Sequence, residues 1–182
     1  MKLVISLVAI AAALGCAAPA TAAHPQRPAG PVLDEANVIP ASDEAALSDR
    51  LSKYYQTSGN AIVVATVTSL DGETIEDYAN ELFGEWRVGD ADTDRGVLLL
   101  LAPNDHQARI EVGCGLEGTV TNGIAEQIMQ TKLIPQYHQQ HFLEGTLAGV
   151  NALIGYLDTS TPANDNGPHS QVCLARAKGS GQ

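Results

Sequence analysis

Basic side chains are scarce in this sequence of 182 residues: ten lysines and arginines stand against 21 aspartates and glutamates, for a formal net charge of −11. Without Lys2, which lies in a leading segment described below, nine basic residues remain, and nine minus 21 gives −12. The basic residues form no stripe or cluster. Nucleic acid is therefore not an expected partner, and an anionic membrane surface does not attract the chain.

Cysteine is scarce too, with residues only at Cys16, Cys114 and Cys173. These form neither a Cys-x-x-Cys motif nor a cysteine–histidine spacing of the kind that binds zinc. No Gly-x-Ser-x-Gly motif is present. Because no histidine is placed to serve as a base for Cys114, a small buried side chain is favoured there over a nucleophile. In an oxidising compartment Cys114 and Cys173 can pair, an alternative that the sequence leaves open.

Long apolar runs are missing except near the N-terminus. There Lys2 precedes the apolar run Leu3–Leu14, which is about half as long as a membrane span. Small residues at Ala20–Ala23 then form cleavage sites, which predicts a signal peptide over residues 1–23 and a periplasmic or secreted protein that starts at Ala23 or His24. A lipoprotein anchored at Cys16 is the less favoured alternative. No apolar run of membrane-spanning length follows in the mature chain.

The rest of the sequence predicts one domain. Residues 24–31 carry three prolines and predict a linker, and residues 159–182 are rich in Pro, Asn, Gly and Ser and predict a disordered tail. Between them, residues 32–158 alternate between helical and strand patterns. The expected elements are a helix from a Ser42 cap to Gly59, strands at 61–67, 96–102 and 109–112, and helices at 74–86, 121–133 and around 147–157.

This order of elements predicts an α/β fold, a layered α/β sandwich with a small mixed β-sheet flanked by helices. Strands 61–67 and 96–102 should be parallel, joined by a right-handed crossover through helix 74–86. Strand 109–112 should return antiparallel after the turn at 103–107. With the turn centred near Asp105, paired positions sum to about 210, with a slip of one or two allowed.

The stretch after strand 109–112 is the most informative one. Gly113, Gly115 and Gly118 lie between a strand and a helix, in the spacing of a phosphate-cradling loop. Glu117 places a carboxylate inside that loop, and no acidic residue ends a second strand about 20 positions on. No nucleotide cofactor is therefore expected, and the glycines are better explained by close packing of a helix on a sheet. The candidate binding loop comprises Gly113, Cys114, Gly115, Gly118 and Asn122.

Acidic residues are expected to converge on this loop. The hairpin pairing places Val97 opposite Gly113, and therefore Asp94 near Leu116 and Glu117. Carboxylates so close repel one another unless a hard cation joins them, which indicates calcium or magnesium. Arg95 at the sixth position excludes an EF-hand, and a solvated acidic loop is the alternative. The candidate metal ligands are Asp90, Asp92, Asp94 and Glu117, with Glu111 one pleat further in.

Four motifs resemble the TPM domain family over about residues 31–157. They are Val32-Leu-Asp34, Gly96-Val-Leu-Leu-Leu, the loop segment 109–118 and Phe142-Leu-Glu-Gly145. The resemblance implies a compact α/β sandwich in an extracytoplasmic protein. A plant lumenal branch of the family is associated with acid phosphatase activity and photosystem repair, an animal branch is an accessory to membrane receptors, and calcium binding is reported within the family.

The sequence departs from the family pattern at two loop positions and after the domain. Cys114 stands where an aromatic residue is usual, Asn122 stands where many members have an acid, and no membrane helix or Gly-rich tail follows. Asp94, Glu111 and Glu117 remain the ligands that the resemblance favours, with Asn122 a neutral ligand at most. The preferred function is an envelope module that binds a cation or a membrane-protein partner without catalysis. A divalent-cation-assisted acid phosphatase is the alternative.

Overall fold

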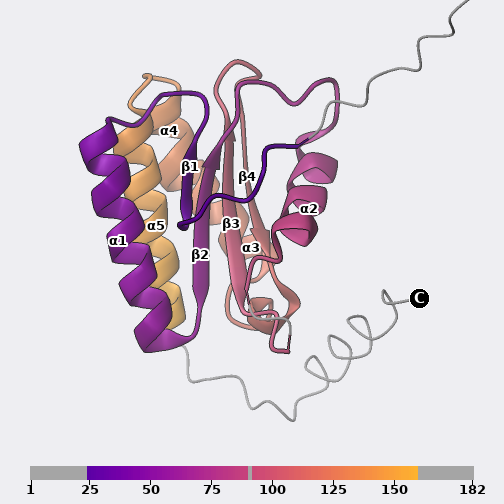
Figure 1. The fold of residues 1–182 in the computed structure, drawn as a ribbon, viewed down its shortest axis with the longest axis vertical. Coiled ribbons are helices and arrows are strands. Elements are labelled where there is room, and N and C mark those ends of the chain that lie inside the picture. Colours follow the sequence, from indigo (N-terminus) through magenta and orange to yellow (C-terminus); the bar gives the residue numbers. More distant parts are fainter. Residues whose placement is uncertain (1–23, 90–91, 160–182) are drawn as a thin grey trace, which may run out of the picture.

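The computed structural model describes residues 24–89 and 92–159 (Figure 1). Its centre is a sheet in the order β1-β2-β3-β4. Strands β1 (Val32–Asp34), β2 (Ala61–Thr66) and β3 (Gly96–Ala102) run parallel, and β4 (Gln107–Val112) is antiparallel to β3. This confirms the α/β class and the mixed sheet. The predicted signal peptide with Cys16, the candidate ligand Asp90, and Cys173 in the predicted tail lie outside the described residues.

Helices cover both faces of the sheet. Helices α1 (Ala41–Ser58) and α5 (Phe142–Thr159) lie side by side on one face, and α2 (Ile75–Trp86) lies on the other (Figure 1). The side chains of β3 alternate between these layers: Leu99 packs in the core with α1 and α5, while Leu98 and Leu100 pack with α2. All three leucines are 0% exposed. A continuous apolar run is what a strand covered on both faces requires.

The hairpin β3–β4 has a register one residue away from the expected one. Val97 pairs with Val112, so paired positions sum to 209, and the expected partner Gly113 comes one residue later. The difference lies within the predicted slip. Its consequence is that Asp94 meets the beginning of the glycine loop instead of Leu116 and Glu117.

Two helix boundaries differ from the sequence pattern. Helix α1 begins at Ala41 with Pro40 as its N-cap, so the Ser42 cap was wrong. The Pro40 carbonyl accepts hydrogen bonds from the N–H groups of Asp43 and Glu44, which already starts the helix there. The expected helix 121–133 is α3 (Asn122–Ile128) followed by a π-helical segment (Met129–Leu133) and α4 (Ile134–Tyr137). Pro135 lacks an N–H to continue the α-helical ladder, which accounts for the irregular turn before it.

In the part of the chain that the structure describes, no helix combines the length and the apolar character needed to cross a membrane.

Candidate functional site

Asp94 lies just before β3 and forms hydrogen bonds with the glycine loop. Its carboxylate Oδ2 accepts a hydrogen bond from the N–H of Cys114 at 2.8 Å, and its carbonyl accepts one from the N–H of Gly115 at 3.1 Å. Burial raises the pKa of the Asp94 carboxyl, and the hydrogen bond from Cys114 opposes part of that increase. Asp94 therefore lies beside the glycine loop, at Cys114 and Gly115 and not at the expected Leu116 and Glu117, and its carboxylate already accepts a backbone hydrogen bond.

The glycines of the loop differ in whether the surrounding atoms leave room for a side chain. A Cβ on Gly113 would overlap the carbonyl oxygen of Asp94, and a Cβ on Gly115 would overlap that of Thr93. A Cβ on Gly118 would meet nothing within 4 Å. Close packing against the backbone that precedes β3 therefore explains Gly113 and Gly115, in place of the expected packing of a helix on the sheet, and it does not explain Gly118.

The other predicted ligands lie apart from Asp94. Glu111 accepts hydrogen bonds from the Arg109 guanidinium at 3.1 and 3.2 Å, and Arg109 also reaches Glu76 of α2 at 3.5 Å. Asp92, Glu117 and Asn122 are exposed, and Asn122 is the first residue of α3. Among the described residues, no three of the predicted ligands offer oxygens close enough to share an ion. Since Asp90 is not among the described residues, calcium or magnesium at this rim stays a prediction.

Cys114 is disulfide-bonded. The thiol is therefore unavailable as a nucleophile, and Cys114 is a half-buried disulfide cysteine in place of the small buried side chain that the sequence favoured. The other two cysteines, Cys16 and Cys173, lie outside the described residues, so the pairing of Cys114 with Cys173 stays the open alternative that it is in the sequence.

Replacing Asp94 by asparagine is expected to raise the melting temperature at pH 7. The folded-state pKa of Asp94 is raised above the unfolded value of about 3.9. Protonation of Asp94 therefore stabilises the fold at low pH, and this contribution is lost as pH rises through the folded-state pKa. The asparagine amide carries no charge, its Oδ1 still accepts from Cys114, and asparagine suits the φ of 48° at this position. Thermal denaturation between pH 3 and 8 measures the difference, which should vanish below about pH 3.9.

Glu117→Gln is the control for that experiment, since Glu117 is an exposed carboxylate of the same loop. It should leave the melting temperature at pH 7 unchanged. A wild type more stable than Asp94→Asn at pH 7 would contradict the prediction. Repeating the scan in millimolar calcium also tests the predicted rim site, because calcium bound there would stabilise the wild type selectively and reverse the order.

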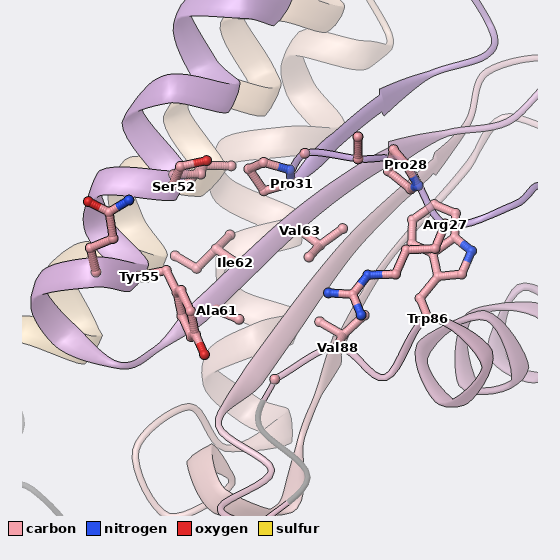
Figure 2. A pocket seen from close by; sticks show the side chains of 15 residues that line it. Arg27, Pro28, Pro31, Ser52, Tyr55, Ala61, Ile62, Val63, Trp86 and Val88 are labelled. Atoms are coloured by element: carbon pink, nitrogen blue, oxygen red, sulfur yellow. The ribbon is translucent and has the colours of Figure 1, made fainter.

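A second feature, which the sequence did not predict, is a groove of about 410 Å³ beside the first half of β2 (Figure 2). Its floor is the sheet edge itself. Tyr55 of α1 flanks it on one side, and Trp86 and Val88 flank it on the other (Figure 2). Tyr55 is the one large hydrophobic side chain among the described residues that is markedly exposed, at 44%. The floor and the upper rim are formed by Ala61, Ile62, Val63, Pro28 and Pro31.

The groove exists because β1 covers only half of β2. Strand β1 pairs with Val64–Thr66, and the N–H of Val64 donates to the Pro31 carbonyl at 2.9 Å. The N–H of Ala61 instead donates to Arg95, on the β3 side. Since successive residues of a strand point their N–H and C=O groups to opposite edges, those of Ile62 point into the groove.

Proline explains why this edge stays open. Continuing the ladder would require the backbone nitrogen of Pro31 to donate to the Ile62 carbonyl, and that nitrogen carries no hydrogen. Before Pro31 the chain turns away towards α2, where the Trp86 indole Nε1 donates to the Pro25 carbonyl at 2.9 Å. Among the described residues, the Ile62 peptide groups consequently have no strand partner on this edge.

One cation lies over the groove. The Arg27 side chain extends across its rim towards Val88 (Figure 2). Arg27 is exposed and forms no ion pair with any described carboxylate. The groove therefore combines an apolar lining, unpaired backbone groups and a positive charge.

Comparisons with known proteins give a consistent result. The family described as TPM domain matches residues 32–156, and no curated protein matches the chain. The N-terminal domain of a protein from P. gingivalis has 30% identity and a TM-score of 0.65, with 70% of this chain and 81% of that chain covered.

Two further solved structures share the fold at lower identity. The N-terminal domain of the cg2496 protein from Corynebacterium glutamicum has 17% identity and a TM-score of 0.57, with 79% of this chain and 88% of that chain covered. The BA42 protein from the psychrophilic bacterium Bizionia argentinensis has 19% identity and a TM-score of 0.57, with 72% and 92% covered.

Proposed function

The chain belongs to the TPM domain family, and from this premise we propose that it acts outside the cytoplasm as a binding module. Its ligand is an extended segment of a partner protein, such as a membrane protein, that carries a carboxylate. The segment lies in the groove beside β2. The observation that carries this proposal is that the peptide groups of Ile62, a residue only 1% exposed, have no strand partner at the floor of the groove within the described part of the chain.

Strand addition is the binding mode that suits such an edge. An extended peptide beside β2 would donate a backbone N–H to the Ile62 carbonyl and accept the Ile62 N–H, which supplies affinity independent of sequence. The open stretch Ala61–Val63 is about 10 Å long at ~3.3 Å per residue, enough for a short segment. The groove volume of about 410 Å³ lies within the usual range of ligand sites.

Arg27 indicates the chemistry of the segment. An extended segment in the groove would bring a side chain or its C-terminus next to the guanidinium, where a carboxylate forms a charge-assisted hydrogen bond. The chain as a whole is strongly acidic. Further carboxylates on the partner would therefore be repelled, so that one acidic group beside Arg27 is preferred over an acidic run.

The binding role is preferred over the phosphatase alternative because the groups that catalysis would need are engaged. Cys114 is in a disulfide, the Asp94 carboxylate accepts from the backbone, and Glu111 is paired with Arg109. None of these contacts activates a nucleophile or positions a base. The relation to the plant lumenal branch stays a prediction.

The first test is hydrogen exchange of the free, ¹⁵N-labelled protein. The Ile62 amide should exchange at least about tenfold faster than the amides of Ala61 and Val64, because those two donate to Arg95 and Pro31 and Ile62 has no strand partner. A random octapeptide library displayed on phage then supplies binders, which are synthesised and added. Bound peptides should slow exchange at Ile62 and should contain Asp, Glu or a free C-terminus.

Arg27→Gln should weaken these peptides about five- to tenfold through loss of the charge-assisted contact. Lys132→Gln is the matched control, since Lys132 is an exposed cation on the π-helical segment and does not line the groove. It should leave affinity unchanged. Peptides that bind without protecting the Ile62 amide, or a library that yields no binder, would contradict the proposal.

A further inference from the structure

His24 begins the described chain, and its side chain is nevertheless almost fully buried. Its side chain is 6% exposed and meets the Tyr78 ring of α2 edge-on, with ring centroids 4.5 Å apart. Nδ1 lies 3.2 Å from Glu85 Oε2, and Nε2 lies 3.5 Å from Glu73 Oε1. Nε2 is fully buried and has no hydrogen-bond partner. A buried polar nitrogen without a partner is costly and calls for an explanation.

The orphaned nitrogen points into a group of carboxylates. Single ligand atoms of His24, Glu73 and Glu81 all lie within 4.8 Å of one another. Glu81 and Glu85 are four residues apart in α2, so both project from the same side of the helix. Glu73 directly precedes the N-cap Thr74. One imidazole is thus surrounded by three carboxylates.

The charge in this group is not balanced by the protein. No described lysine or arginine forms an ion pair with Glu73, Glu81 or Glu85. Even a protonated His24 leaves two negative charges in excess. A divalent cation would neutralise the excess.

We propose that His24, Glu73 and Glu81 bind one zinc ion, with Nε2 of His24 as the nitrogen ligand. One imidazole nitrogen with carboxylate oxygens suits zinc, whereas calcium prefers oxygen ligands alone. Glu85 contacts the other imidazole nitrogen, Nδ1. By accepting from Nδ1 it directs the lone pair of Nε2 towards the ion, as carboxylates beside metal-bound histidines commonly do.

Zinc at this position would attach the N-terminal segment to α2. The hydrogen bond from Trp86 to Pro25 is one attachment of this segment, and the metal would be a second. Residues 27–31 of the same segment line the groove beside β2. The metal site does not depend on what the groove binds, and each can be tested without the other.

The test is zinc binding by the tag-free protein, measured by equilibrium dialysis against zinc chloride with metal analysis and by calorimetry. The expected stoichiometry is one, with a melting temperature that rises with zinc concentration. His24→Gln and Glu73→Gln should each lower the zinc affinity at least about tenfold. Glu81→Gln, at an exposed position, should do the same without disturbing packing. Circular dichroism and melting in EDTA verify that each variant folds.

Two controls separate this site from others. His106→Gln removes an exposed histidine of the hairpin turn, and Asp94→Asn alters the predicted acidic rim; both should bind zinc as the wild type does. The proposal is overturned if the wild type takes up no zinc at 100 µM, on the order of weak non-specific binding. It is equally overturned if all three ligand variants keep wild-type affinity, or if calcium competes with zinc at equal concentration.

Discussion

Replacing Gly115 by alanine is expected to lower the free energy of unfolding by about 2–4 kcal/mol. The added Cβ would overlap the carbonyl oxygen of Thr93 and lie 3.1 Å from the carbonyl carbon of Asp94. These are backbone atoms, which cannot rotate aside as a flexible side chain can. The loop would have to move away from β3, and the hydrogen bond from Cys114 to the Asp94 carboxylate would be lost with it.

Gly118→Ala is the matched control, because it introduces the same methyl group in the same loop with nothing within 4 Å. It should change the free energy of unfolding by less than about 0.5 kcal/mol. Urea denaturation of both variants, at equal m-values, gives the comparison. Equal destabilisation by the two substitutions would show that the contact with Thr93 is not the cause.

The glycine loop shows how much of the candidate site could be predicted from the sequence. Its position between β4 and α3, and the approach of Asp94 to it, follow from strand periodicity and from the hairpin register, which was one residue off. The partners of the acidic residues could not be predicted in the same way. Whether a carboxylate meets an ion, an arginine or a backbone N–H depends on side-chain direction, and Glu111 meets Arg109.

Strand β1 was not expected, and the reason is physical. Three residues carry too little periodicity to be distinguished from a loop. Its pairing depends on β2, a neighbour 32 positions away in the pair Val32–Val64. The groove is a consequence of the same long-range pairing, since it lies where β1 stops short of the beginning of β2.

The proposed zinc ligands could not be predicted from the sequence either. His24 lies in the proline-containing segment that composition predicts as a linker, and the glutamates on α2 resemble a solvated helix face. The structure packs that segment on the domain through Trp86 and Tyr78. Only then does the imidazole meet carboxylates from 49 and 57 positions further on, at Glu73 and Glu81.

Asp34→Ala should lower the free energy of unfolding by about 3 kcal/mol, because it removes three hydrogen bonds at once. The Asp34 carboxylate accepts from the N–H of Val38 at 3.1 Å, from that of Ile39 at 2.7 Å and from the Thr66 hydroxyl at 2.5 Å. Thr66 is 0% exposed, and its oxygen in turn accepts from the N–H of Ala36. The network closes the turn between β1 and α1, and alanine would leave its donors unsatisfied.

Glu35→Ala, at an exposed neighbouring position, is the control and should stay within about 0.5 kcal/mol of the wild type. Hydrogen exchange then shows which strand pairing is lost in Asp34→Ala. The Val64 amide donates to Pro31 just before β1, whereas the Ala61 amide donates to Arg95 just before β3. If Asp34 holds β1 on the sheet, Asp34→Ala should remove protection at Val64 and preserve it at Ala61. Protection that persists at Val64 would mean that β1 stays paired and that the lost stability comes from the turn alone.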